Sequence, residues 1–226
     1  MVENVRDGPV PLEVRLEHQR CGDRGVEALC GVLTNLFEGG LAYTRIIKAW
    51  KNDVGDDGCV ALGKLLLLQG SSRGTHMREL HLSHNNISAA GALALLAACK
   101  QVYPIKDCST GAKQPLWLRL HCNVIDSAMF ATRAGRLFCE CSSSNSCNPR
   151  TCRQNPVPPF HLPFLHDQRR RDVGGGGAWG RGGGLVRDSF PQRAPNFSLQ
   201  DYLFLAPAPT SARQHVSHSR ICNVTH

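Results

Sequence analysis

Four clustered cysteines in the second half of the chain are the residues best suited to chemistry. Cys139, Cys141, Cys147 and Cys152 follow the spacing C-x-C-x5-C-x4-C, and His161 and His166 come shortly after them. Such a cluster can supply the tetrahedral ligands of a structural zinc ion, which folds loops that lack a core of their own. The spacing is not that of paired C-x2-C knuckles, so unliganded cysteines in a loop and a redox role stay open. These four cysteines are the candidate metal ligands, and no other cofactor is expected.

Motifs of catalytic sites are absent from the sequence. It contains no G-x-S-x-G, no H-E-x-x-H and no Walker lysine loop. Asp53, Asp56 and Asp57 fall where a helix is expected to begin, and negative charges there interact favourably with the helix dipole. His81 and His121 could approach each other, but no acidic residue completes an acid–base or metal site with them. We therefore predict a binding protein and not an enzyme.

An internal repeat provides the elements that must position these side chains. Residues 77–91, MRELHLSHNNISAAG, follow the pattern L-x-x-L-x-L-x-x-N-x-I-x-x-x-G, with Met77 at the first apolar position. Weaker copies begin at residues 11, 44 and 115. The corresponding polar residues lie 33, 33 and 38 residues apart: Gln19, Asn52, Asn85 and Asn123. The longer last interval predicts an inserted loop at 102–114. Each copy reads as a short strand followed by a helix, and about three such units must stack to bury their apolar faces.

The pattern resembles the leucine-rich repeat, specifically the strand-then-helix type of ribonuclease-inhibitor-like proteins. The resemblance covers roughly residues 11–138, and it departs from the pattern at Ala49, which stands at a leucine position, and at Met129, which replaces the glycine. It implies an α/β fold, a short solenoid of about four strand–helix repeats. In such a fold, an asparagine such as Asn85 can satisfy backbone groups where the chain leaves the strand.

The helix that follows each glycine carries an apolar stripe. Ala92, Leu95, Leu96 and Cys99 fall at i, i+3, i+4 and i+7, and Val26, Leu29 and Leu33 trace a similar face. Four cysteines of the repeats are expected to be small buried hydrophobic residues and not partners in disulfides: Cys21, Cys30, Cys59 and Cys99.

The strand positions between the leucines should form columns on the concave face, the usual binding surface of a solenoid. The first column is Glu13, Ile46, Glu79 and Trp117; the middle one is Arg15, Lys48, His81 and Arg119; the third is Glu17, Trp50, Ser83 and His121. The middle column is basic or potentially basic throughout, and two outward-facing tryptophans flank it. We predict a site for a partner protein with an acidic or mixed surface, made of Arg15, Lys48, Trp50, His81, Trp117, Arg119 and His121. The alternative is a solvated face on which Glu13 and Glu17 pair with Arg15 and its neighbours.

The passage from the fourth repeat through the cysteine cluster to VPPFHLPFL also resembles, more loosely, uncharacterised protist and algal proteins. In those, similar repeats and a Cys-rich spacer precede a PIN-like nuclease domain. Here the downstream aspartates are scattered among Gly, Arg and Pro without a strand–helix framework: Asp167, Asp172, Asp188 and Asp201. The sequence therefore lacks that domain, and the resemblance implies a truncated or alternative product.

The chain divides into a repeat region (1–138), a Cys-rich segment (139–166) and a mostly disordered Arg/Gly/Pro-rich tail (167–226). The net charge is +8, and the tail contributes Arg169–Arg171, Trp179 and Arg181, which resemble an RGG-type segment. An alternative function is therefore that of an RNA-associated protein that uses the tail and the Cys-rich segment.

Neither end of the repeat region looks like a good cap, because residues 1–10 and 139–152 have poor cap composition. Open ends could be covered by a partner or a second copy, or could mean that the chain is a fragment. The N-terminus has no apolar stretch typical of a signal peptide, and the run at Leu65–Leu68 is far too short to span a bilayer. We expect an intracellular protein, cytoplasmic or nuclear, without a membrane partner.

Overall fold

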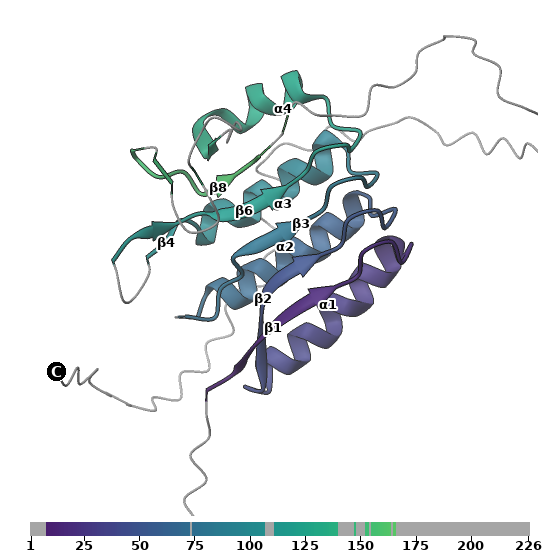
Figure 1. The fold of residues 1–226 in the computed structure, drawn as a ribbon, viewed down its shortest axis with the longest axis vertical. Coiled ribbons are helices and arrows are strands. Elements are labelled where there is room, and N and C mark those ends of the chain that lie inside the picture. The colour runs from purple at the N-terminus through teal and green to yellow at the C-terminus, as the bar shows by residue number, and fades with distance from the viewer. Residues whose placement is uncertain are drawn as a thin grey trace, which may run out of the picture. The chain divides into compact units, whose positions relative to one another are not determined.

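Alternating strands and helices build one parallel sheet with helices on one face (Figure 1). The computed structural model describes residues 8–72, 74–106, 111–139, 147, 152–153, 155–163 and 165; the predicted tail lies outside them. The repeat units are β1 (Val10–Arg15) and α1 (Gly22–Glu38), β2 (Ala42–Lys48) and α2 (Asp56–Gly70), β3 (Glu79–His81) and α3 (Ala89–Val102), and β6 (Leu116–Arg119) and α4 (Ser127–Ala134). This arrangement confirms the α/β solenoid of strand–helix repeats.

Two further strands extend the sheet beyond the fourth repeat. A short 3-10 turn, η1 (Gly135–Leu137), leads into β7 (Phe138–Cys139), and β8 (Phe160–His161) follows later in the chain. The strand order is β1-β2-β3-β6-β8-β7, and every neighbouring pair is parallel. The inserted loop predicted at 102–114 contains a separate antiparallel pair, β4 (Ile105–Lys106) and β5 (Lys113–Gln114).

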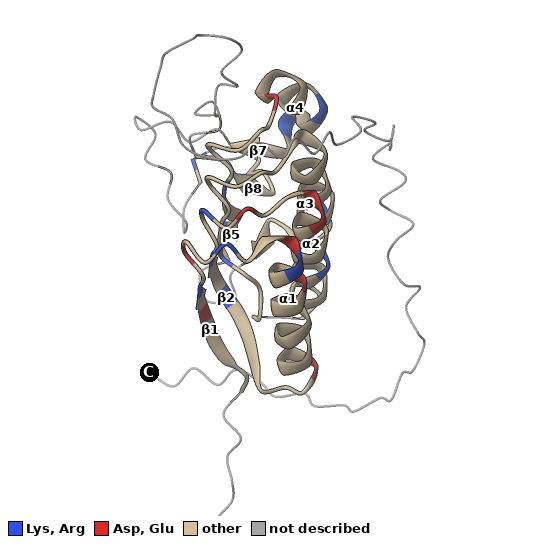
Figure 2. Cartoon of the chain, turned by 90° about the vertical axis from the view of Figure 1, so that its right-hand side faces the viewer, with Lys and Arg blue, Asp and Glu red and all other residues tan. Residues whose placement is uncertain are grey.

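The core lies between the sheet and the helices, which occupy opposite sides in Figure 2. Ile47, Leu80 and Leu118 are paired across neighbouring strands and have no exposed surface. Their common burial follows from the period of two along each strand, which turns every second side chain to the same face. No helix of the described residues covers the other face of the sheet, which is called the open face below. No helix in the described part of the chain is long and apolar enough to cross a membrane.

Three buried asparagines, the asparagine ladder (Asn52, Asn85 and Asn123), join each repeat to the one before it. The Asn85 Oδ1 accepts hydrogen bonds from the backbone N–H of Asn52 (2.8 Å) and of Val54 (3.1 Å). Its Nδ2 donates to the carbonyls of Ala49 (2.9 Å) and Leu82 (3.0 Å). Asn52 and Asn123 make the same kind of contact with their own preceding repeats. The predicted role of Asn85 is confirmed.

A second inter-repeat contact comes from aspartates at the helix starts. The Asp23 Oδ1 accepts hydrogen bonds from the backbone N–H of Gly55 (2.6 Å) and of Gly58 (3.0 Å). Asp56 accepts from the backbone N–H of Ser88 (2.8 Å) and from its hydroxyl (2.6 Å). These carboxylates therefore do more than offset a helix dipole, because they tie the starts of α1 and α2 to the next repeat.

The glycines that end the second and third repeat motifs make room for this carboxylate. A Cβ on Gly58 would lie 2.7 Å from Asp23 Oδ1, and a Cβ on Gly91 would lie 2.8 Å from both the Cα and the Cγ of Asp56. In the next step of the repeat, Ala89 stands where the aspartate would be and Met129 where the glycine would be. Because the third repeat has no aspartate at this position, the fourth repeat needs no glycine to make room for it. Met129 is therefore compatible with the repeat fold.

The C-terminal end of the sheet is capped, contrary to the expectation of two open ends. Phe160, Leu162 and Leu165 are buried and join the main core, and the ring of Phe138 stacks on Phe160 at 6.1 Å between centroids. This cap could not be predicted from the sequence, because these apolar residues have no repeat periodicity and stand among prolines. At the other end, β1 is an edge strand, and no described residue covers it.

Replacing Asn85 with Ala should lower the free energy of unfolding by about 3 kcal/mol, because buried loop amides lose their acceptor. The matched control is Gln19→Ala, at the first position of the same series, where the exposed amide donates only to the Glu17 carbonyl (3.2 Å). Urea unfolding monitored by circular dichroism should place Gln19→Ala within about 0.5 kcal/mol of the parent. Equal effects of the two variants would contradict the ladder.

Replacing Gly91 with Ala should destabilise the protein by about 1–3 kcal/mol, because the added methyl meets Asp56. The control is Gly31→Ala in α1, where a Cβ meets nothing within 4 Å. That change should stabilise by up to about 1 kcal/mol, since alanine is the better helix former. Thermal unfolding would show opposite shifts in Tm. If Gly91→Ala were as stable as Gly31→Ala, the proposed steric clash with Asp56 would be contradicted.

Candidate functional site

The open face displays the predicted side-chain columns in register. Backbone pairing aligns Glu13, Ile46, Glu79 and Trp117 across β1, β2, β3 and β6, and it aligns Arg15, Lys48, His81 and Arg119 in the same way. The register of the first two columns is therefore confirmed, because side chains at paired positions of parallel strands point to one face.

Part of the basic column is neutralised by one acid. Glu13 accepts hydrogen bonds from Lys48 Nζ (2.7 Å) and from Arg15 Nε (3.0 Å). The hydrogen bond from Lys48 is the main reason that the pKa of Glu13 lies below its ordinary value. The alternative of paired charges thus holds for this end of the face, where two cations share one carboxylate.

His81 is an uncharged member of the column at neutral pH. Burial, together with the nearby Arg119 and Lys48, lowers its pKa to about 4. Its Nε2 lies 3.3 Å from the Glu79 carboxylate, but this contact is an ion pair only when the imidazole is protonated. The middle column is therefore cationic at Arg15, Lys48 and Arg119 and neutral at His81.

A row of rings crosses the ends of the strands. The ring centroids of His18 and Trp50 lie 4.1 Å apart, those of Trp50 and His84 6.4 Å, and those of His84 and His121 5.6 Å. The Lys51 ammonium lies 5.2 Å from the Trp50 ring. Trp50 and His121 belong to the predicted third column.

The other two rings of the row come from a different position of the repeat. His18 and His84 follow the predicted members Glu17 and Ser83, and the expectation missed them. Both histidines have left-handed backbone, with φ of 62° and 57°. The same backbone recurs at Lys51 and Cys122, the equivalent residues of the other repeats. The position is thus set by the turn that leaves each strand.

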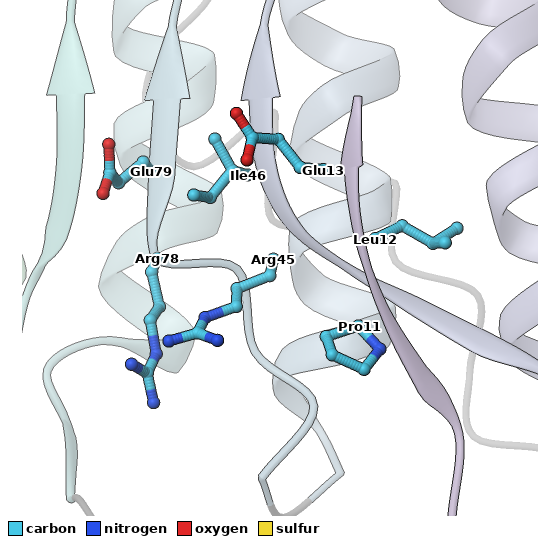
Figure 3. A pocket seen from close by; sticks show the side chains of 7 residues that line it. All are labelled: Pro11, Leu12, Glu13, Arg45, Ile46, Arg78 and Glu79. Carbon is cyan, nitrogen blue, oxygen red and sulfur yellow. The ribbon is translucent and has the colours of Figure 1, made fainter. Parts of the chain in front are cut away.

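A shallow hollow lies at the ends of the strands opposite the row of rings. Two of its lining residues are arginines that the repeat pattern did not single out. The hollow, of about 250 Å³, is lined by Pro11, Leu12, Glu13, Arg45, Ile46, Arg78 and Glu79. Figure 3 shows Arg45 and Arg78 extending from neighbouring segments, whose backbones are joined by a hydrogen bond from Arg78 N to Arg45 O (2.7 Å). The register of β1 with β2 shifts between Leu12 and Glu13, so Arg45 has no partner residue in β1. Such a bulge redirects local side chains, and repeat spacing alone does not reveal it.

Trp117 lies on the open face, but it is not available to a partner. Only 8% of it is exposed, because Cys139, Cys147 and Cys152 pack against it. Its ring centroid is 5.5 Å from that of His161. The expectation of an outward-facing Trp117 is wrong, because those described residues of the Cys-rich segment cover its ring.

The three cysteines and the histidine around Trp117 form a cluster that could hold a metal ion. The ligand atoms of Cys139, Cys147, Cys152 and His161 all lie within 4.8 Å of one another. Burial lowers the pKa of His161 to about 4, so its imidazole is neutral at neutral pH. Cys141, a predicted ligand, lies outside the described residues. The cluster can hold a metal ion, with His161 as the fourth donor atom.

The thiols inside the repeats have another character. Cys30, Cys59 and Cys99 are buried and form no disulfide, as expected, and Cys21 is half-buried. Burial raises the pKa of Cys30 and of Cys99 to about 12. Such thiols are packing residues, because the thiolate that reacts or binds metal is suppressed.

Comparisons with known proteins agree with this architecture. Residues 75–96 match the family model described as Leucine Rich repeat. The chain is also similar to the ribonuclease inhibitor of Sus scrofa, with 33% identity over 90 residues, which are 40% of this chain and 18% of that protein. The chain thus spans less than a fifth of the length of this relative. Both similarities are to leucine-rich repeats, a repeat type that supports a protein-interaction module in a general sense.

Between pH 7 and pH 5 the stability should fall, in part through His81. Its folded pKa of about 4 lies below the ordinary 6.5, so the unfolded chain binds more protons in this window and acid favours unfolding. Its contribution at pH 5 is at most about 2 kcal/mol.

Replacing His81 with Gln should make the fall in stability shallower in urea unfolding followed across this pH range. The control is His18→Gln, which replaces an exposed histidine in the turn after β1. Parallel pH curves for the parent and His81→Gln would contradict the assignment.

Proposed function

Because residues 10–134 form leucine-rich repeats of the ribonuclease-inhibitor-like type, we propose that the chain is a protein-binding module whose open face contacts an acidic or mixed surface of a partner. Parallel strands held in register give this face a fixed spacing of side chains. A rigid face binds at a lower entropic cost than one that must order on contact. We also propose that the chain acts inside the cell, in the cytoplasm or nucleus.

The observation that carries the proposal is the arginine hollow on the open face. Within the described residues, neither Arg45 nor Arg78 has an ion pair, whereas Arg15 and Lys48 already share Glu13. Guanidinium groups present a planar fork that matches carboxylates. An acidic side chain of a partner therefore gains the most binding free energy by pairing with Arg45 and Arg78. Arg119 adds a further cation in the middle of the face.

The ring row supplies the apolar part of the same surface. Trp50 lies between the rings of His18 and His84 and is half-buried, so it is held in place and still presents surface. Tryptophan and arginine are the residues most enriched in interface hot spots. The hollow and the ring row lie at opposite ends of the strands, which suits a partner that spans the sheet.

The relative's name supports a protein partner in a general sense. The ribonuclease inhibitor of Sus scrofa is named for inhibition of a ribonuclease, and the aligned repeats are of the same type. The similarity does not extend to a choice of partner, since it covers 18% of that protein.

The test is affinity capture with the full-length chain and two triple variants, followed by quantitative mass spectrometry. Face variant Arg45→Ala, Trp50→Ala, Arg78→Ala should lose bound partners by at least about 10-fold, because each position is a candidate hot spot. The control variant, Arg24→Ala, Lys64→Ala, Lys100→Ala, removes exposed charges of helices α1, α2 and α3. It should retain every partner; equal capture by the two variants would overturn the proposal.

Treatment with RNase separates this proposal from the RNA-associated alternative. Partners of the open face should survive RNase and should bind a chain that lacks residues 167–226, since the cap residues up to Leu165 remain. Partners lost on RNase treatment and on removal of 167–226 would assign the activity to the tail.

A further inference from the structure

We propose that Cys139, Cys147, Cys152 and His161 bind one structural zinc ion, which fastens the C-terminal cap to the open face. The site goes beyond the proposed function, because it needs no partner and lies at the end of the sheet away from the arginine hollow. Its ligands come from β7, from the segment between β7 and β8, and from β8.

The distances in the cluster are those of ligands around a common ion. The sulfurs of Cys139 and Cys147 are 3.9 Å apart. This is far longer than a disulfide bond of about 2.05 Å. It is close to the separation of about 3.8 Å that two thiolates have when each lies about 2.3 Å from a tetrahedral zinc. All four ligand atoms lie within 4.8 Å of one another, so small side-chain movements would bring them around a single ion.

The sheet itself positions two of the ligands. Cys139 of β7 is paired with His161 of β8, and His161 is paired in turn with Trp117 of β6. The three side chains therefore continue the first column of the open face. The backbone N–H of Leu162 donates to the Cys139 carbonyl at 3.0 Å, which locks the two strands together. Cys147 and Cys152 complete the set by packing over Trp117.

The donor set selects zinc and a closed site. Three thiolates and one imidazole match the Cys3His type of structural zinc site, whereas magnesium and calcium prefer oxygen ligands. Four protein ligands leave no open position for substrate, so the ion would be structural. It would also explain why Cys147 and Cys152, whose neighbours in the sequence offer little apolar surface, pack against Trp117.

The test uses the full-length chain, purified without added chelator and then stripped of metal. Elemental analysis should find one zinc per chain before stripping. The stripped protein should bind Co2+ with the intense visible bands of tetrahedral thiolate coordination, and Zn2+ should displace the Co2+. Absence of zinc together with absence of these bands would overturn the proposal.

Variants of the ligands identify which atoms bind. Cys147→Ser and His161→Asn should each weaken Zn2+ binding by more than about 100-fold in competition with a colorimetric chelator, because even outer-shell changes cost 10–100-fold. Because His161 is buried, the replacement His161→Cys guards against simple misfolding. It should keep one metal per chain, with Co2+ bands shifted toward those of four-sulfur coordination.

Two cysteine controls complete the test. Cys21→Ser removes a half-buried thiol of the first repeat and should leave metal binding unchanged. Cys141→Ser should also leave it unchanged, since His161 fills the fourth position. Loss of zinc in Cys141→Ser together with its retention in His161→Asn would overturn the proposed ligand set.

Discussion

Buried backbone groups at the loops between strand and helix must find protein partners, and the asparagine ladder provides them. Each loop leaves N–H and C=O groups inside the molecule, where an unmade hydrogen bond is costly. One side-chain amide per repeat satisfies both kinds of group in the repeat before it, as Asn85 does for Asn52, Val54 and Ala49. The ladder therefore fixes the height at which neighbouring repeats stack, and the strand register follows from it.

The open face inherits its regularity from this constraint. Because the strands are held level, Arg15, Lys48, His81 and Arg119 line up in one column. The same turns bring histidines and Trp50 into one row at the ends of the strands. At the last repeat the stacking would end in an exposed sheet edge, but β8 pairs with β6 there and β7 pairs with β8. The regular open face and the stable core thus share one cause.

Features that recur in every repeat could be predicted from the sequence, whereas features found in a single repeat could not. Spacing predicted the strands, the positions of the asparagines and two columns, because each follows from a period of about 33 residues. It could not show the bulge that gives Arg45 its place in the hollow, since a one-residue shift leaves the repeat spacing intact. It also took Trp117 as exposed, because its burial depends on contacts with Cys147 and Cys152 that have no counterpart in other repeats. Cysteine spacing singled out three of the four residues of the candidate cluster but not His161, which the pairing of β7 with β8 brings opposite Cys139.

The most direct measurement is native-state hydrogen exchange at three of the loop amides that donate to ladder oxygens, those of Asn52, Val54 and Ile87. If the ladder holds the repeats together, these amides exchange only when the whole solenoid unfolds, with the free energy found in denaturant unfolding. The amide of Gly40, in the exposed turn after α1, provides the reference for local opening. Exchange of the three loop amides as easily as that of Gly40 would contradict the central role of the ladder.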